Sequence, residues 1–179
     1  MPNDTSGLSA PFETSRLLLL PFTRDLVVLA LRNRSTLARV LELAVPAEWP
    51  GPDLEEILPF LDGAMAAQPE RAHWMRLIVH RADRVLIGSA GFIDVPDDEQ
   101  RLEMGYHLVP AYRGQGYATE AARGLLDLAF AQGVRLVQAE CDRENAASIR
   151  VLQRLGMLCT GRDGSVLRWT LQLGGGDSR

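Results

Sequence analysis

The chain has 179 residues, a formal net charge of −4 and 46% hydrophobic residues. This balance allows one substantial core and argues against a disordered chain or a nucleic-acid-binding surface. The longest apolar stretches are far shorter than the roughly 20 residues of a membrane helix. The N-terminus also lacks the basic start and apolar region of a secretion signal. We therefore expect a cytoplasmic protein that binds neither membranes nor nucleic acid.

The use of cysteine and lysine narrows the possible chemistry. Cys141 and Cys159 show no CxxC spacing, which favours a reducing compartment and argues against a disulfide or zinc framework, so no metal site is expected. All 19 basic residues are arginine. The absence of lysine excludes a Walker-type phosphate loop and pyridoxal-phosphate chemistry.

Changes in hydrophobic period predict the elements in chain order. A strand at 16–21 precedes helical segments at 24–43 and 53–67, and strands follow at 73–80 and 84–94. The second half is predicted as strand 101–109, helix 115–131, strand 134–141, helix 144–155, and strands 157–161 and 165–173. Residues 1–12 and 174–179 are expected to be flexible ends of a single domain, 13–173.

Hairpins followed by two strand–helix units indicate an α/β (α+β) fold. We expect a mixed, mostly antiparallel sheet of about seven strands, flanked by helices.

A glycine turn, Arg113–Ala118, joins the strand at 101–109 to the following helix. Pro110 ends the strand, and two glycines let the backbone turn and approach a ligand. The unpaired N–H groups and positive dipole of the next helix would then face that ligand, an arrangement that binds phosphate. A dinucleotide fingerprint fits poorly, because Thr119 stands where its third glycine or alanine belongs.

Three segments resemble one family. RGQGYA (113–118), within YRGQGYATEAARGLL (112–126), is similar to the acyl-coenzyme A signature of the GNAT superfamily of N-acetyltransferases. ENAASIRVLQRLGM (144–157) resembles a second block of that family, and TSRLLLLPFTRDL (14–26) its first strand and helix entry. The resemblance is to the branch containing the ribosomal-protein N-terminal acetyltransferases. It implies a V-shaped splay between the fourth and fifth strands and acetyl-CoA as cosubstrate.

The resemblance also implies residue roles. The coenzyme pyrophosphate would rest on the backbone of the glycine turn, and Asn145 would bind the pantetheine arm. The expected cofactor-binding residues are Leu108, Val109, Arg113, Gly114, Gln115, Gly116, Tyr117, Ala118, Thr119 and Asn145. Arg150 and Arg154 are either contacts for the adenosine 3′-phosphate or a solvated helix face.

By the same resemblance, three residues are expected to carry the chemistry. The backbone N–H of Leu108 would stabilise the developing negative charge on the thioester oxygen, and a β-bulge there would free it. Ser148 would supply a proton or hydrogen bond to the departing thiolate. Strand alternation places Glu103 and His107 beside Gly105. Glu103, acting directly or through water, is the leading candidate base, with His107 an alternative.

The sequence thus predicts transfer of an acetyl group from acetyl-CoA to a primary amine, by direct attack in a ternary complex. The acceptor is left open between a protein N-terminus and a small molecule, and so is a homodimer. Trp49 and Trp74 are expected in the core or on the acceptor side. The alternative is a catalytically inactive acyl-CoA sensor or scaffold, which would keep the glycine turn without the proton-handling residues.

Overall fold

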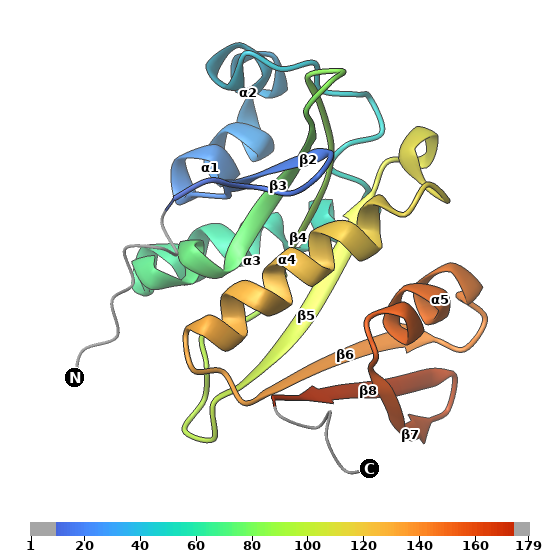
Figure 1. Ribbon diagram of the computed structural model, residues 1–179. Coiled ribbons are helices and arrows are strands. Elements are labelled where there is room, and N and C mark those ends of the chain that lie inside the picture. Colours follow the sequence, from blue (N-terminus) through green and yellow to red (C-terminus); the bar gives the residue numbers. More distant parts are fainter. Residues whose placement is uncertain (1–9, 174–179) are drawn as a thin grey trace.

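The computed structural model describes residues 10–173, which form one sheet flanked by helices (Figure 1). The strands are β1 (Phe12–Glu13), β2 (Leu17–Pro21), β3 (Met75–His80), β4 (Val85–Phe92), β5 (Arg101–Leu108), β6 (Leu136–Asp142), β7 (Leu158–Asp163) and β8 (Val166–Gln172). The helices are α1 (Arg24–Arg32), α2 (Arg34–Leu41), α3 (Pro52–Ala67), α4 (Tyr117–Ala131) and α5 (Ala146–Arg154), with short 3₁₀ helices η2 (Pro69–Trp74) and η3 (Pro110–Tyr112).

The sheet has the strand order β1-β2-β3-β4-β5-β6-β8-β7. Neighbouring strands are antiparallel except β5 and β6, which run parallel and pair only where residues 101–103 meet residues 136–138. Beyond Glu103 and Gln138 the two strands diverge, and Figure 1 shows the resulting V. The predicted fold and the splay between the fourth and fifth predicted strands are confirmed.

Burial differs between the two halves of the sheet. Nearly every residue of β3 and β4 is buried, as expected for central strands with both faces covered. In β6, buried and exposed residues alternate, because one of its faces is open to solvent. Figure 1 shows α4 and α5 on the near side of the sheet and α3 behind it.

Three details differ from the sequence prediction. An eighth strand arises because Phe12 and Glu13 pair with Leu19 and Leu18, so the segment expected to be flexible is ordered at Phe12. Residues 1–9 and 174–179 of the predicted flexible ends lie outside the described residues. The strand expected from residue 73 begins at Met75, after η2.

The predicted helix 24–43 is two helices. Asn33 separates them, and its side-chain oxygen accepts a hydrogen bond from the Thr36 N–H at 3.0 Å, which caps α2. Asparagine favours such caps because its short side chain satisfies an otherwise unpaired N–H group.

No helix within residues 10–173 is long and apolar enough to cross a bilayer.

Candidate active site

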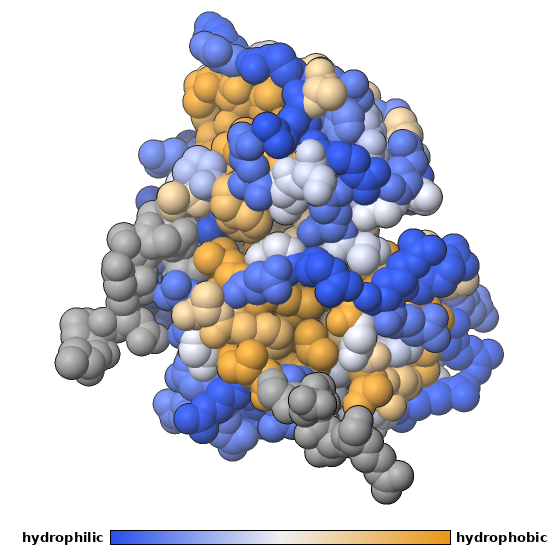
Figure 2. Space-filling model, in the orientation of Figure 1, coloured by the Kyte–Doolittle hydropathy of each residue, from blue (hydrophilic) through white to orange (hydrophobic). Residues whose placement is uncertain are grey.

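A cleft of about 430 Å³ opens where β5 and β6 diverge. Figure 2 shows a notch in the molecular surface on this side, next to α5. Its lining comes from the start of α3, the end of β5, the glycine turn with the first turn of α4, and α5. The lining residues are Asp53, Tyr106, His107, Leu108, Arg113, Gly114, Gly116, Tyr117, Ala118, Thr119, Asn145, Ala147, Ser148, Arg150, Val151 and Arg154.

The glycine turn lies at one end of this cleft. Gly114 and Gly116 have φ angles of +75° and +85°, values that side-chain-bearing residues adopt at a cost. Helix α4 begins directly afterwards, at Tyr117, so its first N–H groups have no partner within the helix. The hydroxyl of Thr119 is buried in the cleft lining without a partner among the described residues.

Positive charge accompanies these donors, because Arg113, Arg150 and Arg154 also line the cleft. Unpaired amide donors at a helix N-terminus, together with guanidinium groups, suit a ligand that carries phosphate. The residues present therefore fit coenzyme A.

The backbone of Leu108 faces the opening between the strands. The Val109 N–H donates to the Ile87 carbonyl, and the Glu103 carbonyl accepts from the Ile93 N–H. The odd-numbered residues of β5 thus direct their backbone groups to β4. In an antiparallel pair the backbone groups of alternate residues point to opposite sides of the strand. The backbone groups of the even-numbered residues therefore point away from β4, and the Leu108 N–H points toward the side from which β6 has diverged.

The β-bulge expected at Leu108 is not found, because β4 and β5 keep one register from Gly88 opposite Leu108 to Phe92 opposite Met104. The divergence of β6, rather than a bulge, leaves the Leu108 N–H without a strand partner.

Arg113 ties the glycine turn to the end of β5. Its Nε donates to the Leu108 carbonyl at 2.8 Å, and its Nη2 lies 3.1 Å from His107 Nε2. Burial lowers the pKa of His107 and the charge of Arg113 lowers it further, against the opposing effect of Asp53. An arginine can only donate, so neutral His107 accepts at Nε2 and carries its proton on Nδ1. With Nε2 occupied, His107 is poorly placed to act as a base.

A hydrogen-bonded pair, Tyr106 and Ser148, lies in the same cleft. The Tyr106 hydroxyl is 2.8 Å from the Ser148 Oγ. Burial raises the pKa of Tyr106 to about 12, against the opposing effect of this bond, so Tyr106 keeps its proton at neutral pH. When Tyr106 donates to Ser148, the serine proton is free for another acceptor.

Sequence reasoning missed Tyr106, because strand alternation places it on the other face of the strand from Glu103 and His107, where the base was sought. The available signal was that a half-buried tyrosine needs a partner for its hydroxyl.

Asn145 caps helix α5. Its side-chain oxygen accepts a hydrogen bond from the Ser148 N–H at 3.0 Å. This bond fixes the first turn of α5 and so the position of Ser148. The amide nitrogen of Asn145 has no acceptor among residues 10–173, so it keeps its donors for a ligand.

Glu103 does not line the cleft. It lies on the opposite face of β5 from Leu108 and five positions away, a span of about 16 Å along the strand. Its side chain is exposed, yet desolvation raises its pKa and the charge of Glu140 raises it further. Glu140 on β6 was not singled out from the sequence; its own partner is Arg168, whose Nε lies 2.9 Å from a Glu140 oxygen.

The remaining predicted residues lie outside the cleft lining. Val109 is buried, and Gln115 uses its side chain to donate to the Ala111 carbonyl. Trp49 and Trp74 are core residues. Burial raises the pKa of Cys141, which keeps the thiol protonated and unsuited to be a nucleophile. Within the described part of the chain, no three side chains of His, Cys, Asp or Glu are grouped to hold a metal ion.

Known proteins share this architecture. A crystal structure of ribosomal-protein-S5-alanine acetyltransferase from Vibrio fischeri superposes with a TM-score of 0.65 at 19% identity, covering 94% of this chain and 100% of that one. The self-immunity acetyltransferase MccE for microcin C7, solved in complex with acetyl-CoA and AMP, gives a TM-score of 0.60 at 15% identity over 89% of this chain and 93% of that one. The fold is therefore that of the splayed-sheet acetyltransferases.

The sequence matches the acetyltransferase (GNAT) domain over residues 16–158. An uncharacterized N-acetyltransferase of Bacillus subtilis, YjdG, is 25% identical over 159 residues, which is 88% of this chain and 95% of the relative. The chain belongs to the GNAT family of acetyltransferases.

Replacing Gly116 tests the conformation of the glycine turn. A Cβ here would meet Arg16 at an ordinary 3.5 Å, so the cost of Gly116→Ala arises from the backbone, and we expect a loss of about 1–2 kcal/mol in the free energy of unfolding. Gly63→Ala is the matched control, since its Cβ would meet nothing within 4 Å in the interior of α3 and should stabilise by up to ~1 kcal/mol. Urea denaturation measures both, and equal effects would refute the strained conformation.

Proposed function

We propose that the protein transfers the acetyl group of acetyl-CoA to a primary amine by direct attack in a ternary complex. One observation carries the proposal: the glycine turn, the Leu108 N–H and the Tyr106–Ser148 pair all face one cleft. These are the groups needed to hold a thioester, to polarise its carbonyl and to protonate its leaving group. The acceptor is a protein N-terminus or a small-molecule amine. The name of the Vibrio fischeri neighbour gives an alanine of ribosomal protein S5 for that enzyme.

The cleft residues divide into holding and reacting groups. Acetyl-CoA would supply an acetyl group activated as a thioester. The amides of residues 113–119 and the side chains of Arg150 and Arg154 would hold its phosphates. The Asn145 amide would donate to the pantetheine arm, beside Ser148 on the first turn of α5.

Two groups would act on the bond that breaks. The Leu108 N–H would donate to the carbonyl oxygen as negative charge develops there, and a fixed backbone donor needs no reorganisation to do so. Ser148 would donate its proton to the sulfur as the thiolate leaves. Tyr106, which stays protonated, would orient the Ser148 hydroxyl by donating a hydrogen bond to its oxygen.

The amine must lose a proton to attack, since amines are mostly protonated near neutral pH. We propose Glu103 for this role. Its raised pKa makes it a stronger base than an ordinary carboxylate. Because Glu103 lies outside the cleft, it would act through intervening water molecules along the face of β5 that carries Gly105.

Turnover separates this function from that of an acyl-CoA sensor. Purified protein is mixed with acetyl-CoA and a panel of amines that includes peptides with free N-termini, polyamines and amino acids, and thiol release is followed. Amine-dependent release is expected. Calorimetric binding of acetyl-CoA without release for any amine would favour the sensor, and absence of binding would contradict both.

Substitution of the hydroxyl pair tests the proton donor. General acids contribute about 10²–10⁴-fold to rate, so Ser148→Ala should lower kcat by about 100-fold or more while coenzyme binding changes by less than about threefold. Tyr106→Phe, which keeps the ring, should lower kcat by about fivefold, the loss of one hydrogen bond of ~1 kcal/mol. The double variant should be no slower than Ser148→Ala, because Tyr106 acts through Ser148. Multiplicative losses would show that the two act independently.

The pH dependence tests Glu103. A base must be ionised, so activity should be lost as pH falls through its pKa, and that pKa is raised above the ordinary value of 4.5. The acid limb of kcat/KM should therefore lie at higher pH than an ordinary carboxylate would give. Glu140→Gln removes a charge that raises the pKa of Glu103 and should move the limb to lower pH.

Glu103→Gln should abolish that limb without loss of stability at pH 7, because the ionised carboxylate is disfavoured by its surroundings. If the pH profile of kcat/KM is unchanged in Glu103→Gln, Glu103 is not the base. The same follows if the acid limb is lost in Glu140→Gln and kept in Glu103→Gln.

A further inference from the structure

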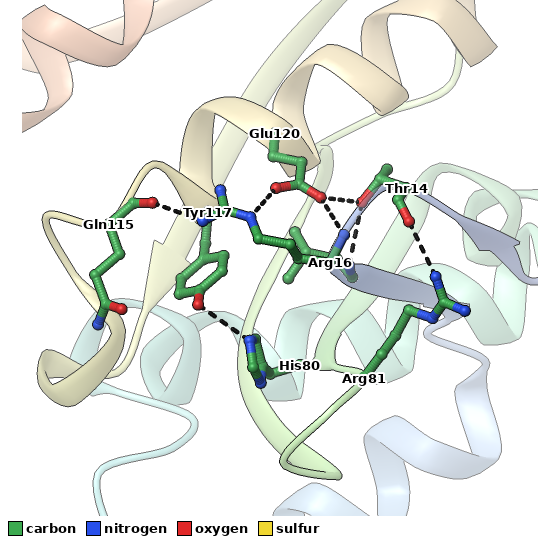
Figure 3. Close-up of polar contacts among 8 residues, drawn as sticks. Thr14, Arg16, His80, Arg81, Gln115, Tyr117 and Glu120 are labelled. Atoms are coloured by element: carbon green, nitrogen blue, oxygen red, sulfur yellow. Dashed lines mark hydrogen bonds and ion pairs between the residues drawn. The ribbon is translucent and has the colours of Figure 1, made fainter.

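A short segment preceding β2 contacts the glycine turn and the start of α4 (Figure 3). A carboxylate oxygen of Glu120 accepts hydrogen bonds from the Thr14 hydroxyl at 2.6 Å and from the Arg16 N–H at 2.7 Å. The Arg16 Nε lies 2.7 Å from the other oxygen. The Arg16 Nη1 donates to the Gln115 carbonyl at 3.1 Å. Arg16 therefore binds both the glycine turn, at Gln115, and the first helical turn of α4, at Glu120.

Arg16 also packs against the residue that begins α4. Its guanidinium carbon lies 4.2 Å from the ring centre of Tyr117. The Tyr117 hydroxyl in turn lies 3.0 Å from His80 Nε2, at the end of β3. Arg16 thus holds the peptide of Gln115, and Arg16 and His80 together hold the side chain of Tyr117 (Figure 3).

The position of Glu120 gives Arg16 an electrostatic role. Glu120 lies in the first turn of α4, beside the amide donors that would meet a pyrophosphate, and an unpaired carboxylate there would repel that anion. Burial alone would raise the pKa of Glu120, but the hydrogen bonds from Thr14 and Arg16 outweigh it and hold the pKa below its ordinary value. Glu120 is therefore ionised, and Arg16 compensates its charge.

The contribution of the Arg16–Glu120 pair to folding stability does not by itself explain why Arg16 also binds the glycine turn. The Arg16 side chain is 44% exposed, although Glu120 is 15% exposed, and a partly exposed ion pair contributes modestly to folding. The bond to the Gln115 carbonyl, however, fixes a peptide group within the turn whose N–H groups would meet the pyrophosphate.

We propose that Arg16 is a positioning residue for the coenzyme, which sets the pyrophosphate-binding backbone of residues 113–119 and cancels the charge of Glu120 without touching the ligand. This inference rests on the proposed function, because it assumes that the glycine turn binds pyrophosphate.

Calorimetry with two ligands tests it without an acceptor. Coenzyme A carries the pyrophosphate, whereas S-acetylpantetheine lacks it. For Arg16→Gln the Kd for coenzyme A should rise roughly tenfold or more, the effect of one charge-assisted interaction, while the Kd for S-acetylpantetheine should stay within about twofold. In turnover, the KM for acetyl-CoA should rise with kcat retained.

Arg81→Gln is the matched control. Arg81 is 43% exposed, pairs with Glu13 at 2.8 Å and donates to the Thr14 carbonyl, but it makes no bond to the glycine turn. It should leave both Kd values unchanged. An equal effect of Arg81→Gln, or an equal loss for both ligands in Arg16→Gln, would show a structural role and overturn the proposal.

A second variant isolates the charge. Adding Glu120→Gln to Arg16→Gln removes the uncompensated carboxylate and should restore part of the lost affinity for coenzyme A. If Arg16 only held the turn in place, the double variant would bind coenzyme A no better than Arg16→Gln. Failure of the unaltered protein to bind coenzyme A would overturn the proposed function itself. Tight binding by the unaltered protein and by Arg16→Gln alike would overturn this inference alone.

Discussion

The divergence of β5 and β6 is the constraint on which the site depends. Pairing restricted to residues 101–103 and 136–138 leaves the end of β5 hydrogen-bonded to β4 on one side alone. Backbone donors beyond that point face a cleft instead of a neighbouring strand. In a continuous sheet the Leu108 N–H would belong to a ladder, and Tyr106 and Ser148 would have no opening to share. A local loss of pairing therefore creates the groups that the proposed chemistry requires.

The glycine turn and α5 complete the cleft from opposite sides. The turn offers backbone donors, which are fixed by the two positive φ angles and by contacts to Arg16 and Arg113. Helix α5 offers side chains, set by the Asn145 cap. Preorganisation of this kind matters because donors that are already aligned need not be reordered when a ligand binds.

Much of the fold could be predicted from the sequence because its determinants are local. Period-two and period-3.6 patterns gave the strands and helices, and Gly114 and Gly116 marked the turn. The features that escaped prediction depend on contacts distant in sequence. Tyr106 meets Ser148 across 42 positions, and Arg16 meets Glu120 across 104. Asn33 was overlooked because an N-cap within a polar stretch resembles an ordinary helical residue. A bulge at Leu108 was predicted in order to free its N–H, but the alternation of backbone directions along β5 and the divergence of β6 already do so.

The cations around the cleft are all arginine, and this choice has a chemical consequence. A guanidinium group keeps its proton at any pH at which a protein is folded, so it has no lone pair with which to attack a thioester. An ammonium group on lysine loses its proton far more readily and then becomes a nucleophile. The proposed function brings an activated acetyl group into the cleft that Arg113, Arg150 and Arg154 line, and this positive lining cannot become acetylated and lose its charge. In the proposed reaction, the amine therefore comes from outside the cleft wall.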